Sequence, residues 1–253
     1  MNRTSFQLPF SEQNIPKWPC PKCRVSHLTL VPRSLVYKET PESLREHEHD
    51  DWEPDWIRYI FSCIFECANK DCNEVISCCG EGRVNFVDYE DEEHGWGRCN
   101  ENLFIPKYFN PPLNLMDLPK DCPAEVVGHL SDSFALFFAD PGAALNCART
   151  AVEAVLTDLG IKRFSIAKGK RRPINLHQRI QSLPTKYDEL KELLIAVKWL
   201  GNAGSHAGEE PTADDVRTTY DLLEHALSEI YEAKGKKLKA IAKKVNKMKG
   251  PLK

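Results

Sequence analysis

Two cysteine motifs, Cys20-Pro-Lys-Cys23 and Cys67-Ala-Asn-Lys-Asp-Cys72, constrain this chain more than any other feature. Two thiolates on one tight turn are half of a tetrahedral zinc site, and the second motif supplies the other half. Two such knuckles at the ends of short strands predict a zinc ribbon, which gains its folding free energy largely from the metal. We expect one structural zinc ion per chain, held by Cys20, Cys23, Cys67 and Cys72, with no open coordination position for chemistry.

The other cysteines leave the choice of ligands open. Cys63, Cys78, Cys79 and Cys99 lie near the two motifs, and Cys63 falls on the same strand face as Cys67. We expect all four to be packing residues, but Cys63, Cys78 or Cys79 could replace a predicted ligand. The remaining alternative, that the motifs are merely buried thiols, is disfavoured because two paired spacings rarely arise by chance.

Composition is that of a folded soluble protein. The chain has 253 residues, of which 42% are hydrophobic and 28% charged, so it can bury a core without disulfide staples. It has no apolar run of about eighteen residues, and its N-terminus lacks the apolar region of a signal peptide. We therefore expect a cytoplasmic protein with no membrane partner, whose cysteines are thiols or metal ligands.

The sequence predicts an α+β protein, in which a small β-rich zinc ribbon precedes an all-α helical bundle. We expect a β-rich domain with an acidic insert at 1–89, a Pro- and Asn-rich linker at 90–122, a helical domain at 123–233 and a basic amphipathic tail at 234–253.

Periodicity predicts the individual elements. The expected strands cover 28–31, 58–66, 75–78 and 83–89. The expected helices cover 123–139, 141–160, 174–183, 187–200 and 212–231, with a basic loop at 162–172. Pro141 is a helix-start signal, and Thr212 with Asp215 predicts a capping box.

Polar residues of the helical part could form a charged site. Arg149 and Glu153 are four apart on one helix, within an apolar stripe, so a plain ion pair that orders the bundle is one interpretation. The other is a site at a cleft, together with Lys198, Asn202 and His206 from the Gly-rich end of a later helix. His206 could transfer protons and Arg149 could stabilise a cleaving phosphate, which would suit RNA cleavage.

Three stretches of this part, CARTAVEAVLTDLGI, NLHQRIQSL and ELLIAVKWLGNAGSHAGEE, resemble the domain of unknown function family 4145 over residues 130–232. That family is related to the HEPN superfamily, so the resemblance implies a HEPN-like helical domain. It also implies a homodimer with its site at the dimer interface, and a role as ribonuclease or RNA binder in bacterial restriction, phage-defence or toxin–antitoxin systems. Active HEPN-like members carry an Arg followed by four to six residues and a His. This chain departs from that pattern, because the nearest basic residue before His206 is Lys198.

Three functions are therefore expected as alternatives. The first is a nucleic-acid-associated or partner-binding module of a defence system, binding RNA or DNA or other defence proteins. Its nucleic-acid contacts would be tail lysines, namely Lys236, Lys237, Lys239, Lys243, Lys244 and Lys247. The second is a metal-independent ribonuclease that uses His206 with Arg149 or Lys198, oriented by Asn202 and Glu153. The third is a structural subunit without nucleic-acid affinity, whose acidic insert binds another protein.

Overall fold

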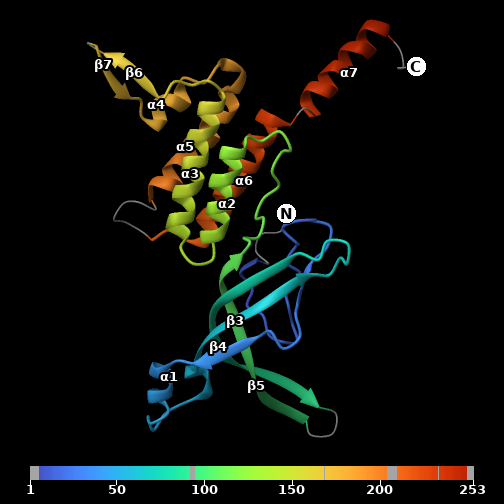
Figure 1. Cartoon of the computed structure of the whole chain (residues 1–253), viewed down its shortest axis with the longest axis vertical. Helices are drawn as coiled ribbons and strands as arrows, with labels where there is room; N and C mark the ends of the chain where they lie inside the picture. Colours follow the sequence, from blue (N-terminus) through green and yellow to red (C-terminus); the bar gives the residue numbers. More distant parts are fainter. Residues whose placement is uncertain (1–5, 92–94, 168, 204–209, 233, 250–253) are drawn as a thin grey trace. The chain divides into compact units, whose positions relative to one another are not determined.

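The computed structural model describes residues 6–91, 95–167, 169–203, 210–232 and 234–249 (Figure 1). The chain divides into two compact units. The first unit comprises Met1–Leu115 and Phe134–Asp140, and the second comprises Met116–Ser133 and Pro141–Lys253. A β-rich first part and a helical second part confirm the predicted α+β class.

A curled antiparallel sheet forms the first unit (Figure 1). Its strands are β1 (Leu28–Leu30), β2 (Val36–Glu39), β3 (Arg58–Cys67), β4 (Val75–Asp91) and β5 (Gly95–Asn110). The order is β1-β3-β4-β5, and β2 pairs with the first half of β3 while β1 pairs with its end. The predicted strand at 58–66 is confirmed, and the strand β2 was not predicted.

Strand β5 lies inside the segment for which the sequence predicts a linker, so that prediction is wrong for residues 95–110. The predicted strands at 75–78 and 83–89 are likewise parts of one long strand, β4. The register shifts between Cys79, which lies opposite Tyr108, and Gly80, which lies opposite Pro106. A Cβ on Gly80 would clash with the Ile105 carbonyl oxygen. The start of β5 is rich in Gly and charged residues and lacks an apolar pattern of its own. Its strand conformation therefore depends on pairing with β4.

An aromatic cluster forms the core of this unit. The ring of Phe10 lies 5.8 Å from that of Trp18, 5.5 Å from those of Phe61 and Phe65, and 5.4 Å from that of Phe104. All five side chains are buried, and most of the contacts are edge-to-face, which aromatic quadrupoles favour. Trp18 precedes the first cysteine motif, so the core adjoins the candidate metal centre.

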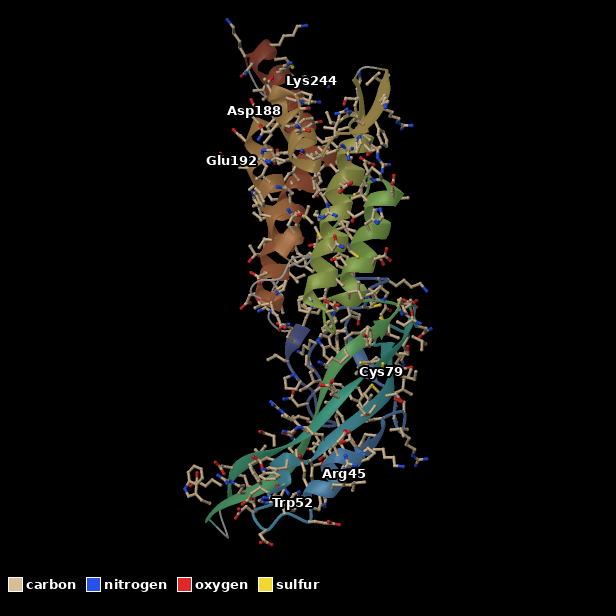
Figure 2. The ribbon with its side chains drawn as sticks, turned by 90° about the vertical axis from the view of Figure 1, so that its left-hand side faces the viewer. Arg45, Trp52, Cys79, Asp188, Glu192 and Lys244 are labelled. Atoms are coloured by element: carbon tan, nitrogen blue, oxygen red, sulfur yellow. The ribbon has the colours of Figure 1, made fainter. Side chains whose placement is uncertain are left out.

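The acidic insert joins β2 to β3 and contains a short helix. Helix α1 (Pro41–Glu46) is capped by the Thr40 side chain, and the 3-10 helix η2 (Pro54–Trp56) follows it. One carboxylate oxygen of Glu39 contacts Ser43 Oγ at 2.7 Å and His47 Nε2 at 2.8 Å. Figure 2 labels Arg45 and Trp52 in this insert.

Helices make up most of the second unit. They are α2 (Ala124–Leu136), α3 (Pro141–Asp158), α4 (Leu176–Gln181), α5 (Asp188–Ala203), α6 (Ala213–Tyr231) and α7 (Lys234–Met248). Helix α3 packs against α5 and α6 through its apolar face, which is rich in Ala and Leu. The predicted start at Pro141 and the Thr212–Asp215 capping box of α6 are both confirmed. Within the described ranges, none of the helices has the length and apolar character that crossing a membrane requires.

The segment predicted as a basic loop is a β-hairpin instead. Strands β6 (Phe164–Ala167) and β7 (Lys170–Pro173) pair antiparallel, with Ser165 opposite Arg172 and Ile166 opposite Arg171. The loop prediction rested on the density of Lys and Arg, which hid the alternation of Phe164 and Ile166 with polar or small residues.

Candidate functional site

The two cysteine motifs come together at one end of the sheet. The Sγ atoms of Cys20 and Cys72 lie 3.8 Å apart, and those of Cys23 and Cys67 lie 3.6 Å apart. All four sulfurs fall within 4.8 Å of one another. Sulfurs at the corners of a tetrahedron about 2.3 Å from a zinc ion would be separated by about 3.8 Å. The cluster therefore has the size that a tetrahedral metal ion requires.

Both motifs use the same backbone turn. The residue after the second cysteine of each, Arg24 or Asn73, has a positive φ of 58° or 50°. In the first turn, the Arg24 N–H donates to the Cys20 carbonyl at 3.0 Å. In the second, the Asn73 N–H donates to the Asn69 carbonyl at 3.1 Å. Left-handed conformation is costly for residues other than Gly, so its recurrence indicates that the cysteine positions determine the turn.

Backbone N–H groups point at the sulfurs. The Asn69 N–H donates to Cys67 Sγ at 3.4 Å, and backbone hydrogen bonds from Val25 and Glu74 act on Cys23 and Cys72. In each case the donor follows its cysteine by two residues. Such donors stabilise negative charge on sulfur, which is the form of cysteine that binds metals.

The thiols of the cluster do not ionise alike. The Val25 N–H is the largest cause that lowers the pKa of Cys23 to about 7, whereas burial raises the pKa of Cys67 to about 12. Burial also raises the pKa of Cys72. Four adjacent thiolates repel one another, so a divalent cation at the centre would supply the charge that lets them coexist.

The alternative ligands lie elsewhere. Cys63 and Cys78 are opposite one another on β3 and β4, where both are buried as expected of packing residues. Cys79, labelled in Figure 2, and Cys99 are exposed, so the expectation that they pack inside is wrong for these two. Among the described residues, the only group of three or more potential ligands close enough to share a metal ion is the predicted set of four.

A second polar cluster lies among the helices. Arg149 Nη1 on α3 donates to the Glu153 carboxylate at 2.9 Å, and the Arg149 guanidinium also contacts Asn146 Oδ1. Glu153 faces a second arginine, Arg179 on α4, whose Nη1 lies 4.0 Å from its carboxylate. The structure contains the predicted ion pair of Arg149 with Glu153, and Arg179 joins these two residues in one cluster.

Arg179 is the member that the sequence did not reveal. Its side chain is only 3% exposed, and one guanidinium nitrogen donates to the Thr157 hydroxyl at 2.8 Å and to the Glu153 and Ile161 carbonyls. Burial lowers the pKa of Arg179, and the Glu153 carboxylate opposes that change. In the sequence, the burial of Arg179 is indicated by its position between Leu176 and Ile180 on the apolar face of a short helix.

Helix α5 brings the second predicted motif beside Arg149. A Cβ added to Gly201 would lie 2.6 Å from the Arg149 Cβ, so α3 and α5 are in close contact there. Asn202 follows Gly201 on α5 and is half-buried. Lys198 lies one turn earlier, with its ammonium 3.1 Å from the centre of the Trp199 ring. His206 lies outside the described residues, so the catalytic set that the sequence predicts is seen without its histidine.

The lysines of the tail lie on α7, where Figure 2 labels Lys244. Lys243, Lys244 and Lys247 are exposed. Lys236, Lys237 and Lys239 belong to the same helix, but their side chains are not among those described.

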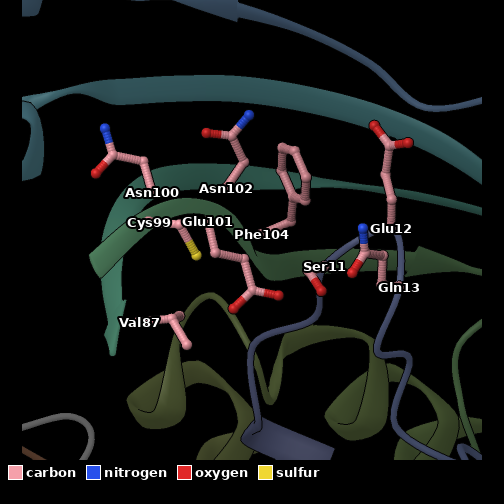
Figure 3. Close-up of a pocket in the computed structure, with 9 residues that line it drawn as sticks. All are labelled: Ser11, Glu12, Gln13, Val87, Cys99, Asn100, Glu101, Asn102 and Phe104. Atoms are coloured by element: carbon pink, nitrogen blue, oxygen red, sulfur yellow. The ribbon is translucent and has the colours of Figure 1, made fainter. Parts of the chain in front are cut away.

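A hollow on β5 is a poor candidate for a catalytic site. Its lining comes from β4, β5 and the N-terminal segment: Ser11, Glu12, Gln13, Val87, Cys99, Asn100, Glu101, Asn102 and Phe104. Figure 3 shows that Asn100 and Asn102 point to one side of β5, while Cys99 and Glu101 point to the other. The side chains do not converge, and the lining contains no Lys, Arg or His to act with the carboxylates.

Two family models match the chain. Residues 8–109 match a domain of unknown function (DUF8608), and residues 131–248 match a domain of unknown function (DUF4145). The second match agrees with the resemblance of the helical part, and the first covers the sheet with both cysteine motifs and β5. No curated protein and no solved structure matches the chain.

Proposed function

We propose that this chain is a nucleic-acid-binding module of a bacterial defence system, with a structural zinc ribbon and a HEPN-like helical domain. The observation that carries nucleic-acid binding is α7, which presents Lys243, Lys244 and Lys247 to solvent. Residues 234–253 contain no Asp or Glu that would neutralise this helix. Clustered lysines gain affinity for phosphates by releasing condensed counterions. The defence setting and the cytoplasmic location rest on the sequence alone.

The proposed zinc ion would be held by Cys20, Cys23, Cys67 and Cys72. The spacing of their sulfurs, the N–H donors directed at them and the all-thiolate composition support zinc at this position. Four protein ligands leave no position for water or substrate. The metal would therefore stabilise the fold and take no part in chemistry.

Binding can be tested with the full chain and fluorescein-labelled single-stranded RNA and duplex DNA over a range of salt concentrations. Replacing Lys243, Lys244 and Lys247 by Gln should weaken binding and lower the slope of log Kd against log salt by about 2 to 3. A matched control replaces Lys17, Lys38 and Lys120, which are exposed but lie outside α7. An equal loss in both variants would show only an effect of net charge, and an unchanged α7 variant would contradict the proposal.

A metal-independent ribonuclease is a second candidate, favoured by the close approach of Gly201, which precedes Asn202 on α5, to Arg149. In this function, His206 would transfer protons and Arg149 or Lys198 would contact phosphate, with Glu153 orienting Arg149. The test is cleavage of structured RNA in EDTA by the wild type beside His206→Ala. Cleavage by the wild type that the variant loses would support the nuclease. Equal cleavage by both, or none by either, would reject it.

Assembly is part of the same proposal. The helical unit would form a homodimer, as the family resemblance implies, and other defence proteins would be its partners. Light scattering during size-exclusion chromatography measures the mass directly, and a 28.8 kDa species at micromolar concentration would reject the dimer. Capture of a protein partner by a chain that binds neither RNA nor DNA would instead favour a structural subunit.

A further inference from the structure

The β6–β7 hairpin is an unusually basic part of the second unit. Residues 159–187 contain no Asp or Glu. In and beside the hairpin, the exposed basic side chains are Lys162, Arg163, Lys170, Arg171 and Arg172. None of these five forms a salt bridge with a carboxylate in the described part of the chain. The hairpin therefore carries a positive charge that no described carboxylate of its own unit pairs with.

Neither face of this hairpin is buried at the positions whose side chains the structure describes. All described side chains of β6 and β7 are exposed, including Ile166 at 82% and Phe164 at 38%. Figure 1 shows the two strands extending away from the helices of their own unit. An isolated two-stranded ribbon has little stability of its own, so exposed apolar residues on it are better explained by a partner than by a core.

The register gives the two faces different characters. Residues directly opposite one another share a face, so Phe164 and Ile166 lie with Pro173 and Arg171 on one side. Arg172 and Lys170 lie with Ser165 on the other side. The Arg171 guanidinium lies 3.7 Å from the centre of the Phe164 ring, which holds this cation on the apolar face.

We propose that the β6–β7 hairpin inserts into the major groove of duplex DNA, a contact separate from that of α7. Two strands lie about 4.8 Å apart, and the B-form major groove is about 12 Å wide and admits a two-stranded ribbon. The Arg171 and Ile166 face meets base edges, where a guanidinium reads guanine and an apolar side chain contacts the thymine methyl group. Arg163, Lys170 and Arg172 contact the phosphates on either side.

The shape of the ribbon selects duplex DNA over duplex RNA. The major groove of an A-form RNA helix is too deep and narrow for side chains to read. Single strands have no such groove and would contact the hairpin only through charge. This inference rests on the proposed nucleic-acid function but assigns it a substrate and a second contact.

The test compares Kd for a 20-base-pair DNA duplex and the RNA duplex of the same sequence, using the full chain. We expect the wild type to prefer DNA. Arg171→Gln with Arg172→Gln should weaken DNA binding at least tenfold and lower the salt slope by about 1 to 2. Lys17→Gln with Lys120→Gln removes the same charge from exposed positions elsewhere and should change Kd less than twofold.

Protection of guanine N7 from methylation locates the contact, because N7 lies in the major groove. The wild type should protect N7 and the hairpin variant should not. If the hairpin variant binds DNA as tightly as the wild type, and the wild type leaves N7 unprotected, this inference is wrong. Binding through α7 would be unaffected by that result. Equal affinity for the RNA duplex would overturn the choice of DNA. Failure of the wild type to bind any nucleic acid would reject both proposals.

Discussion

At Gly201, α5 lies in close contact with α3. An added Cβ would lie 2.6 Å from the Arg149 Cβ and 3.0 Å from the Leu145 carbonyl oxygen, and neither atom can move without shifting α3. The sequence predicted that Arg149 and Glu153 form an ion pair, because they are four apart on one helix. It placed Arg179 on the apolar face of a short helix but did not identify its partners, since these are decided by packing between helices.

Gly201→Ala should destabilise the second unit by about 1–3 kcal/mol, because one methyl group would be forced into a closed contact. Gly128→Ala is the matched control, since Gly128 lies within α2 and a Cβ there meets nothing within 4 Å. That control should stabilise by about 0.5–1 kcal/mol through helix propensity. Urea unfolding measures both changes in the free energy of unfolding. A Gly201→Ala variant at least as stable as the wild type would contradict the close approach.

Cys20→Ser tests the metal cluster at a single atom. The variant should bind metal far more weakly and lose ordered structure in the first unit, because the three remaining thiolates cannot complete a tetrahedral site. Cys99→Ser removes an exposed thiol outside the cluster and should leave metal content unchanged. Inductively coupled plasma mass spectrometry and near-ultraviolet circular dichroism measure the two effects. Full metal content in the Cys20 variant would exclude Cys20 as a ligand.

Among the elements, the ones predicted correctly carry their own local signals. Helix α6 has its Thr212–Asp215 capping box, α3 has Pro141 at its start, and β3 alternates strictly. The elements that were missed depend on a neighbour. Strand β5 is held by β4 across a Gly- and Asn-rich sequence, and β6 pairs with β7 through residues that resemble a charged loop. The sequence of one strand alone does not indicate which strand it pairs with.

The cap of α6 predicts a pH dependence. The backbone and side chain of Thr212 hydrogen-bond to Asp215 and lower its pKa below 3.8. The folded-state pKa is depressed, so this stabilisation is complete above the unfolded pKa and is lost as pH falls through the folded value. Thr212→Ala should cost about 1 kcal/mol at pH 7 and less below pH 3. A cost that is constant between these pH values would contradict the reciprocal cap.

For the whole molecule, the division into two units predicts separable stability. The four cysteines of the cluster all lie in the first unit, and none of them belongs to the helical core around α3 in the second. Removing the metal should therefore unfold the first unit and leave the second folded.

Chelation with EDTA or a stronger chelator should abolish near-ultraviolet signals from Trp18 and its aromatic neighbours while most of the helical far-ultraviolet signal remains. Heating the chelated chain should still show one cooperative helical transition. If all secondary structure disappears together on chelation, the units do not fold independently. If nothing changes, the metal is dispensable for the fold.

The most direct test of the metal centre is X-ray absorption at the zinc edge on the purified full chain, together with the zinc content per chain. We expect one zinc ion with four sulfur neighbours at about 2.3 Å. Absence of zinc, or a first shell containing nitrogen or oxygen in place of one of the four sulfurs, would contradict a closed site made of Cys20, Cys23, Cys67 and Cys72.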